Sequence, residues 1–550
     1  MSNSGRRALA TGAAVLALSV AASTARGETL ADAIALAYQS NPTLQGQRAQ
    51  QRALDETYVQ ARAGFRPNLS VGASVQYTNI GFGRSSGQQL VSNGSDGLTA
   101  TSAGGYDYNT SSATLQATQP LYTGGRTETA VSAAEASVLA GRQGLRTTEN
   151  QILQSVVTAY EDVRRDAQIV GIRRENQRVL ASQLDETQTK FTAGQVTRVD
   201  TAQAEAQLAQ ARALLSSAQA QLQISRANYA AVVGQNPGEL APEPPLPGLP
   251  ATVDQAFDIA EQANPSLLQA RLTEQGSRAR ILEARAAKRP TVSLQGSFGY
   301  TGTVAPFDPR NYDRNFTGQL VVTQPLFTGG TTSSQIRQAT EQNTSDRISI
   351  EGARRQVVQQ VSQAWNVLLS SRANVTSNDQ QVRAAAVAFD GIQEQYRAGL
   401  STTLDVLIQQ QNLRDAQLAL VQARHDAYVA EANLLAAMGR LEAGALVRGV
   451  DLYDPAKSFD RVKRADALPW DGVVEALDHV GAPRSGPVRP IAAPSPAVAP
   501  TMALDAEAPV PTNAAPAVAT PTAPIPGTVS PSTPSTLGAR PGAAAPDSQR

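Results

Sequence analysis

Residues that commonly carry acid–base, nucleophilic or metal chemistry are scarce in this chain. Its 550 residues include no Cys and two His. The absence of Cys excludes disulfides, thiolate metal sites and thiol catalysis. His425 and His479 are widely separated, and neither has a second His four residues away on the same helix face. We therefore predict no catalytic, cofactor-binding or metal site, and expect His425 to be a helix-surface or groove residue.

Charge composition narrows the possible partners. Lys and Arg number 47, Asp and Glu also number 47, and the formal net charge is zero. Proteins that bind nucleic acid carry a basic patch or stripe, and this sequence has none. We therefore expect no nucleic-acid partner.

The sequence near residue 1 resembles an export signal. Arg6-Arg7 precede an apolar run from Ala8 to Ala22, which small residues follow through Gly27. This pattern predicts a signal peptide at residues 1–27, cleaved after Ala25 or Gly27. A transmembrane anchor is the alternative, but the run is short and rich in Ala. No later stretch approaches the roughly 20 apolar residues that a membrane-spanning helix needs.

The last part of the sequence, residues 482–550, is dominated by Pro, Ala, Ser and Thr. A segment with so few large apolar residues cannot bury enough surface to offset its ordering entropy. We expect a disordered, solvated tail, with a signalling segment as the alternative.

The remaining sequence is duplicated. Thr29–Thr78 aligns without gaps on Thr252–Thr301, an offset of 223 (252 − 29). After a loop, Thr118-Gln-Pro-Leu-Tyr-Thr-Gly-Gly125 aligns on Thr323-Gln-Pro-Leu-Phe-Thr-Gly-Gly330. A unit of roughly 200 residues is too long for a solenoid repeat. We therefore predict two equivalent halves of one architecture.

Each half contains two stretches of alternating polar and apolar residues. Leu69, Val71, Ala73, Val75 and Tyr77 alternate with polar or small residues, and Val292 to Tyr300 repeat the pattern. We predict strands at about 67–78, 110–120, 290–301 and 314–325. Each has the length of about 10 residues that a tilted strand needs to cross a bilayer. A half-buried soluble sheet has the same period and is the alternative.

Four strands cannot close a membrane barrel, because the smallest barrels use about eight. Lipid also does not tolerate unpaired strand edges. The barrel must then be shared between chains. Two chains would supply eight strands and three would supply twelve, and the larger barrel has room for a conducting lumen.

The rest of each half is rich in Ala, Gln and Leu. Leu208, Leu215, Leu222 and Tyr229 recur at seven-residue spacing, which is typical of coiled coils. We predict long helical hairpins at about 125–234 and 330–439. Their turns contain Gly194 and Gly399, and Thr197 and Thr402 are the expected caps of the returning helices.

These motifs together resemble the TolC family of outer-membrane channel proteins. The residues that carry the resemblance are the duplicated Asn-Pro, Arg-Pro and Thr-Gln-Pro-Leu-(Tyr/Phe)-Thr-Gly-Gly segments, and the two aromatic-x-Ala-Gly turns. The resemblance implies a mainly α protein with a membrane β-barrel portion. Members of this family are homotrimers with a twelve-stranded barrel in the cell outer membrane and a helical coiled-coil tunnel in the periplasm. Their partners are outer-membrane lipid, a periplasmic adaptor and an inner-membrane pump.

The resemblance also implies particular site residues. Asp405 matches a carboxylate that rings the closed aperture of the tunnel, and Tyr396 and Asp200 match a latch between hairpins. The two turns match the tips that face the adaptor: Ala193, Gly194, Gln195, Ala398, Gly399 and Leu400.

Two positions depart from the family pattern. A second aperture carboxylate is replaced by Ile408, and a latch Arg is replaced by Ser401. Gate closure is therefore expected to use other groups, such as Arg397 or Arg198. The resemblance implies that the protein acts as the outer-membrane channel of a tripartite efflux or type I secretion system. A non-conducting, trimeric, periplasm-spanning structural or adhesin-like protein is the alternative, and the cargo stays open.

The predicted layout follows from these assignments. It consists of a signal peptide at 1–27, a first repeat at 28–240, a Pro-rich linker at 241–251, a second repeat at 252–443, a C-terminal periplasmic segment at 444–481 and the tail at 482–550.

Overall fold

The computed structural model describes residues 27–80, 89–92, 98–101, 106–304, 310, 312–447, 452–464 and 468–479. Residues 1–26 of the predicted signal peptide and the predicted tail at 482–550 lie outside these ranges. The chain divides into two units, Met1–Gly486 and Pro487–Arg550. All the described residues belong to the first unit.

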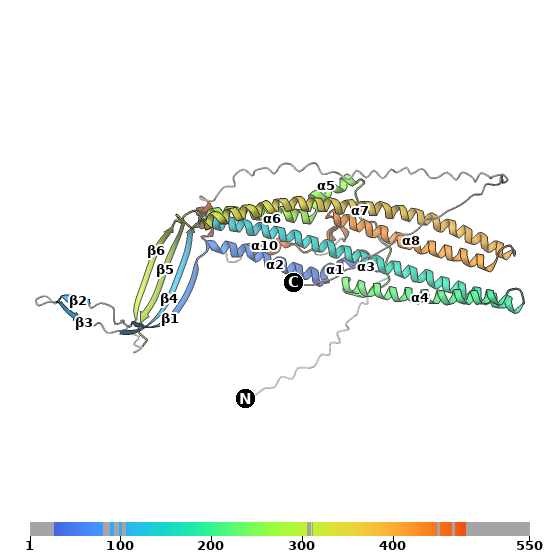
Figure 1. Ribbon diagram of the computed structural model, residues 1–550, viewed down its shortest axis with the longest axis horizontal. Coiled ribbons are helices and arrows are strands. Elements are labelled where there is room, and N and C mark those ends of the chain that lie inside the picture. Colours follow the sequence, from blue (N-terminus) through green and yellow to red (C-terminus); the bar gives the residue numbers. More distant parts are fainter. Residues whose placement is uncertain are drawn as a thin grey trace, which may run out of the picture. The chain divides into compact units, whose positions relative to one another are not determined.

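The two repeats fold in the same order, as Figure 1 shows. Each has two shorter helices, two long strands, one very long helix and one returning helix. The first repeat comprises α1 (Leu30–Ser40), α2 (Pro42–Arg62), β1 (Asn68–Ile80), β4 (Tyr106–Tyr122), α3 (Arg126–Thr192) and α4 (Arg198–Val233). The second comprises α5 (Val253–Ala263), α6 (Pro265–Ala286), β5 (Thr291–Gly302), β6 (Asp313–Thr323), α7 (Thr331–Arg397) and α8 (Thr403–Ala437).

Smaller elements complete the described chain. A short 3₁₀ helix, η1 (Ala63–Phe65), joins α2 to β1. Three helices follow the second repeat: α9 (Ala443–Leu446), α10 (Pro455–Arg464) and α11 (Asp471–His479). No helix within the described ranges is both long and apolar enough to cross a bilayer.

The four long strands form one antiparallel sheet in the order β1-β4-β5-β6. The first pair is longer than the sequence pattern predicts, because its ladder continues to the pair Ile80 and Tyr106. Part of the segment expected to be a loop forms a further hairpin, β2 (Gln89–Ser92) and β3 (Leu98–Thr101). An antiparallel ladder can extend for as long as both strands supply backbone partners.

One face of the sheet is apolar across all four strands. Val71 lies opposite Leu115, which lies opposite Phe298, which lies opposite Phe316. All four side chains are exposed in the single chain. The other face carries polar pairs such as Gln295 and Gln319, which share a hydrogen bond of 2.9 Å. A sheet with one apolar and one polar face is typical of strands that meet lipid on one side and water on the other.

The first part of each predicted hairpin contains no Pro and forms a single helix. α3 and α7 both contain 67 residues, which corresponds to a length of about 100 Å at 1.5 Å per residue. Each pairs with its shorter returning helix to make a hairpin, so α3 and α4 form the first hairpin and α7 and α8 the second.

The duplicated Asn-Pro motif joins each returning helix to the helix beside its end. The side-chain oxygen of Asn264 accepts hydrogen bonds from the backbone N–H groups of Ser266 and Leu267, at 2.9 and 3.3 Å. Its amide donates to the carbonyl of Ala437, at the end of α8, at 2.8 Å. Asn41 does the same between α2 and Val232 of α4. One side chain therefore caps one helix and satisfies a carbonyl of another.

The main hydrophobic core lies where these ends meet. Tyr160 and Tyr229 are fully buried there. The Tyr160 hydroxyl donates to the carbonyls of Glu28 and Ala241, at 2.9 and 2.7 Å. The Tyr229 hydroxyl donates to the Glu28 carboxylate at 2.6 Å. Burial raises the pKa of Tyr160 to about 12 and also raises the pKa of Tyr229. Both tyrosines therefore hold the start of the described chain as neutral donors.

Candidate functional site at the hairpin tips

Both hairpin tips have the same backbone structure. Gly194 and Gly399 follow the ends of α3 and α7 with φ values of 73° and 75°, in the left-handed region that favours glycine. The N–H of Gln195 donates to the carbonyl of Lys190 at 2.9 Å, and that of Leu400 donates to Gln395 at 2.8 Å. This hydrogen bond, together with the one from each glycine, closes a Schellman motif.

Each returning helix begins with a reciprocal cap. The Thr402 hydroxyl and N–H donate to Asp405 at 2.6 and 2.9 Å, while the Asp405 N–H donates to the Thr402 hydroxyl at 3.2 Å. Thr197 and Asp200 repeat this capping box. The prediction that Thr197 and Thr402 are caps is confirmed. The threonine hydrogen bonds lower the pKa of both carboxyl groups, so both aspartates are ionised at neutral pH.

Tyr396, a predicted latch residue, contacts the neighbouring tip through Lys190. The ammonium of Lys190 on α3 donates to the Tyr396 hydroxyl at 2.9 Å and lies 4.6 Å from the centre of its ring. Hydrogen bonds to Glu186 and Tyr396 raise the pKa of Lys190. A charged amine therefore joins the first hairpin to the second near their tips.

The structure does not bring Tyr396 and Asp200 together within one chain. Asp200 accepts hydrogen bonds within its own capping box, and the Tyr396 hydroxyl accepts one from Lys190. Arg397, an alternative closing group, pairs with Glu394 of its own helix at 2.6 Å. Ile408, which replaces an expected carboxylate, is exposed one turn after Asp405.

Further contacts between α3 and α8 continue away from the tips. Leu407 packs against Leu180 in a small buried cluster. Gln410 donates to Asn176 at 3.3 Å, with both side chains buried. These pairs run in opposite directions along the two helices, so α8 lies antiparallel to α3.

A charged contact follows along the same two helices. His425 of α8 lies with Nε2 2.9 Å from Asp162 of α3 and with Nδ1 3.0 Å from Asp426. Burial alone lowers the pKa of His425, but the hydrogen bonds to Asp162 and Asp426 outweigh it, and the net shift is upward. The residue predicted at a helix surface or groove therefore lies at a half-buried junction between the hairpins.

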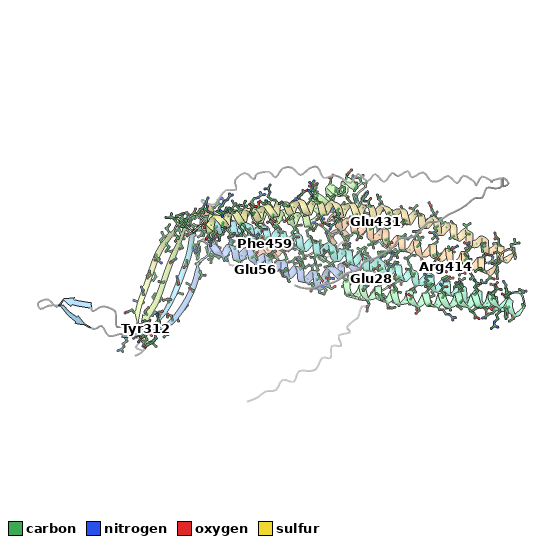
Figure 2. All side chains as sticks on the ribbon, in the orientation of Figure 1. Glu28, Glu56, Tyr312, Arg414, Glu431 and Phe459 are labelled. Carbon is green, nitrogen blue, oxygen red and sulfur yellow. The ribbon has the colours of Figure 1, made fainter. Side chains whose placement is uncertain are left out.

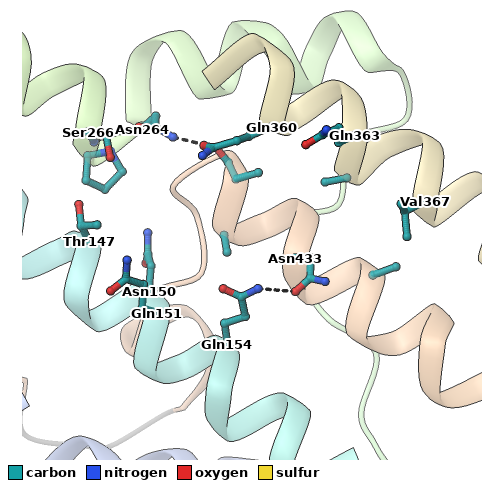
Figure 3. Close-up of a pocket in the computed structure, with 15 residues that line it drawn as sticks. Thr147, Asn150, Gln151, Gln154, Asn264, Ser266, Gln360, Gln363, Val367 and Asn433 are labelled. Carbon is teal, nitrogen blue, oxygen red and sulfur yellow. Dashed lines mark hydrogen bonds between the residues drawn. The ribbon is translucent and has the colours of Figure 1, made fainter. Parts of the chain in front are cut away.

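A cavity of about 450 Å³ lies beyond this junction, between α3, α6, α7 and α8. Figure 3 shows that its walls are rich in Asn and Gln side chains, with Gln154 donating to Asn433 at 2.6 Å. None of the residues that line it is charged. The cavity can therefore offer hydrogen bonds to a neutral group but no compensating charge.

Sequence reasoning did not find Lys190 or Asp162 as contact residues. Their partners lie 206 and 263 residues away in the chain. A single sequence carries no local pattern for such a pairing. The heptad spacing indicates only that these helices pack against others.

A sheet with a lipid-facing side, continued by helical hairpins about 100 Å long, is the architecture of an outer-membrane channel with a periplasmic tunnel. Comparison with known proteins gives the same class. The family described as outer membrane efflux protein matches residues 33–235 and 256–440. Outer membrane efflux protein BepC of Brucella suis is 34% identical over 80% of this chain and 91% of its own length. Outer membrane protein TolC of Escherichia coli is 28% identical over 78% and 85%, respectively.

A solved structure supports the fold. The outer membrane protein VceC of Vibrio cholerae superimposes with a TM-score of 0.61 at 22% identity, covering 74% of this chain and 96% of VceC. The chain belongs to the outer membrane efflux protein family, and the predicted TolC-like fold is confirmed. It is an outer-membrane channel protein of the efflux and type I secretion class, and this family is one of channels rather than enzymes.

Proposed function

We propose that three copies of this chain form one conduit from the periplasm to the exterior. The proposal rests on the edges of the sheet. Among the described residues, β1 and β6 have a strand on one side only. Both edges carry exposed apolar residues, such as Val71 and Phe316, so they belong at the same depth in lipid as the strands between them. Pairing β6 of one copy with β1 of the next would satisfy every edge.

Three copies supply twelve strands, which is enough for a lumen that side chains do not fill. The polar face of the sheet, with pairs such as Ser74 and Ser112, would then line water. The helices would continue the wall of the conduit, since α2, α3, α6 and α7 directly precede or follow the four strands.

The tips would form the periplasmic entrance. We infer that the second hairpin is the inner one, which places three copies of Asp405 around the axis with exposed Leu404 and Ile408 beside them. An apolar constriction with a single carboxylate ring would hold cations less strongly than a double ring. The contact between Lys190 and Tyr396 would hold each inner tip against its outer neighbour. Asp200 remains the candidate for a contact with another copy.

We propose that a periplasmic adaptor docks on the residues Ala193, Gly194, Gln195, Ala398, Gly399 and Leu400. All six are exposed, and they form short turns at the ends of rigid helices, where binding residues are commonly placed. An inner-membrane pump would complete the path. The protein would carry out no catalysis itself, and drug efflux and protein secretion are both compatible with a neutral, polar tunnel.

The decisive experiment measures the mass and the conductance of the same preparation. Light scattering of the detergent-solubilised protein should give a trimer, and the same preparation should form discrete channels in planar bilayers. A stable monomer or dimer would overturn the assembly. A trimer without conductance would favour the non-conducting spacer or adhesin.

A further inference from the structure

The short helix α11 is held where the sheet meets the helices. The buried carboxylate of Asp478 accepts hydrogen bonds from the N–H groups of Thr123 and Gly125, at 2.6 and 3.2 Å. These residues form the turn between β4 and α3. At the other end of α11, Asp471 pairs with Arg66 at 3.3 Å. Arg66 lies three residues before Leu69, the first apolar residue of β1.

The polar side of α11 points toward the helices. Glu475 pairs with Arg62, the last residue of α2, at 3.5 Å. His479 contacts Glu128, in the first turn of α3, at 2.6 Å. At 100° per residue, Glu475 and His479 lie on one side of α11, and the side opposite to them therefore faces away from these helices.

That opposite side is apolar and exposed. Trp470, Val473 and Leu477 have 48%, 64% and 51% of their surface exposed. They follow i, i+3, i+7 spacing and form one stripe beside the inward residues Asp471, Val474 and Asp478. An apolar stripe that contains Trp and lies opposite a polar face is typical of a helix at a membrane surface.

The helix before α11 adds positive charge at this level. The last turn of α10 carries exposed Arg461, Lys463 and Arg464. Arg62 donates to the carbonyl of Lys463 at 3.4 Å, which brings this turn near the start of α11. α10 is fixed on α2 by Phe459 (Figure 2), whose ring centre lies 5.0 Å from that of Tyr58.

We propose that α11 lies in the periplasmic surface of the outer membrane, with Trp470, Val473 and Leu477 inserted between phospholipid headgroups. The stripe lies at the level where the apolar side of the sheet begins, because Asp471 is fixed to Arg66, three residues before Leu69. The basic turn of α10 meets the phosphates of the same lipids. The two carboxylates that hold α11 then fix the depth of the barrel relative to the helices.

Tryptophan fluorescence tests this placement, because the chain has two Trp. Trp365→Phe leaves Trp470 as the reporter, and Trp470→Phe leaves the partly buried Trp365 of α7 as the matched control. The full-length protein is reconstituted in vesicles of phosphatidylethanolamine and phosphatidylglycerol, with and without bromine on the acyl chain near the headgroup. Brominated lipid should quench Trp470 by about twofold or more and leave Trp365 nearly unchanged.

If brominated lipid did not quench the fluorescence of Trp470, the proposal would be overturned. Quenching by aqueous acrylamide alone would then place the stripe in water, and quenching by neither would place it against another protein surface. In a second variant, Val473→Glu with Leu477→Glu, lipid quenching of Trp470 should fall, whereas the matching Ala variant should retain most of it. The readout does not depend on conductance, so failure of this inference is distinct from failure of the conduit.

Discussion

His425 of α8 and Asp162 of α3 form a charged contact of 2.9 Å between the two hairpins. The second ring nitrogen of His425 faces Asp426 at 3.0 Å. Both nitrogens therefore face carboxylate oxygens, and only the protonated imidazolium can donate to both. Asp162 also pairs with Arg165 at 2.8 Å. A small cavity beside His425, separate from the uncharged one, is lined by the charged residues Glu161, Arg164, Arg165, Glu243 and Arg424.

This contact predicts a pH-dependent stability of the paired hairpins. Because the folded pKa of His425 is raised above its unfolded value, its contribution is fully present below about pH 6.5 and is lost as the pH rises through the folded pKa. The thermal midpoint of the helical circular-dichroism signal should therefore fall as the pH rises above 6.5. His425→Gln should remove this fall and cost roughly 1.5–3 kcal/mol at low pH.

His479 supplies the matched control for that measurement. Its side chain is 75% exposed and contacts Glu128 in the first turn of α3, next to the sheet and 34 residues before Asp162 (162 − 128). His479→Gln should leave the pH profile of the hairpins unchanged. A profile that is the same in wild type and His425→Gln would contradict the assigned role of His425.

The contact between Lys190 and Tyr396 predicts a change in closure. Tyr396→Phe keeps the ring but removes the hydroxyl that accepts from Lys190. A partly exposed, charge-assisted contact of this kind contributes about 0.5–1 kcal/mol per copy. Three copies acting together should shift the closed–open equilibrium constant toward the open state by roughly ten- to a hundredfold. Single-channel recordings should show more frequent opening, and cells should become more sensitive to large antibiotics.

Two controls separate this contact from helix capping. Lys190→Met should resemble Tyr396→Phe, and the double variant should add little to either. Asp200→Asn should instead weaken the capping box of α4, whose Asp200 contacts are with Thr197. If Asp200→Asn alone opened the channel, the latch would involve Asp200 and a neighbouring copy.

Substitutions of Gly399 should separate adaptor docking from trimer assembly. Its φ of 75° makes any L-residue unfavourable by about 1–2 kcal/mol. Gly399→Ala and Gly399→Trp share this strain, but only Trp adds bulk to the tip. Trimers and membrane insertion should persist in both variants, whereas export should fail only in Gly399→Trp. Full export by the Trp variant would remove the tip from adaptor docking.

Local patterns in the sequence predict much of this fold, because strands and coiled coils repeat over short distances. The alternation from Leu69 to Tyr77 places β1 and its lipid face, and Thr197 and Thr402 are identifiable as caps. The contacts that join the hairpins cannot be found this way, since Lys190 and Tyr396 lie in different repeats. Nor does any local pattern show that Asp478 caps the turn at Thr123, 355 residues earlier.

The Asn-Pro joint predicts a marked loss of stability from one small change. Asn264 is 5% exposed, caps α6 and donates to the carbonyl of Ala437 in α8. Asn264→Ala would leave the N–H groups of Ser266 and Leu267 and the part-buried carbonyl of Ala437 without these partners, at a cost of roughly 2–3 kcal/mol. Asn264→Asp keeps the capping oxygen but loses the donor, so it should fall between wild type and Ala in chemical unfolding followed by circular dichroism. Pro265→Ala is the control, because proline at the first helical position supplies no hydrogen bond and its loss should cost less. Equal stability of the Ala and Asp variants would show that the bond to α8, rather than the cap, holds this joint.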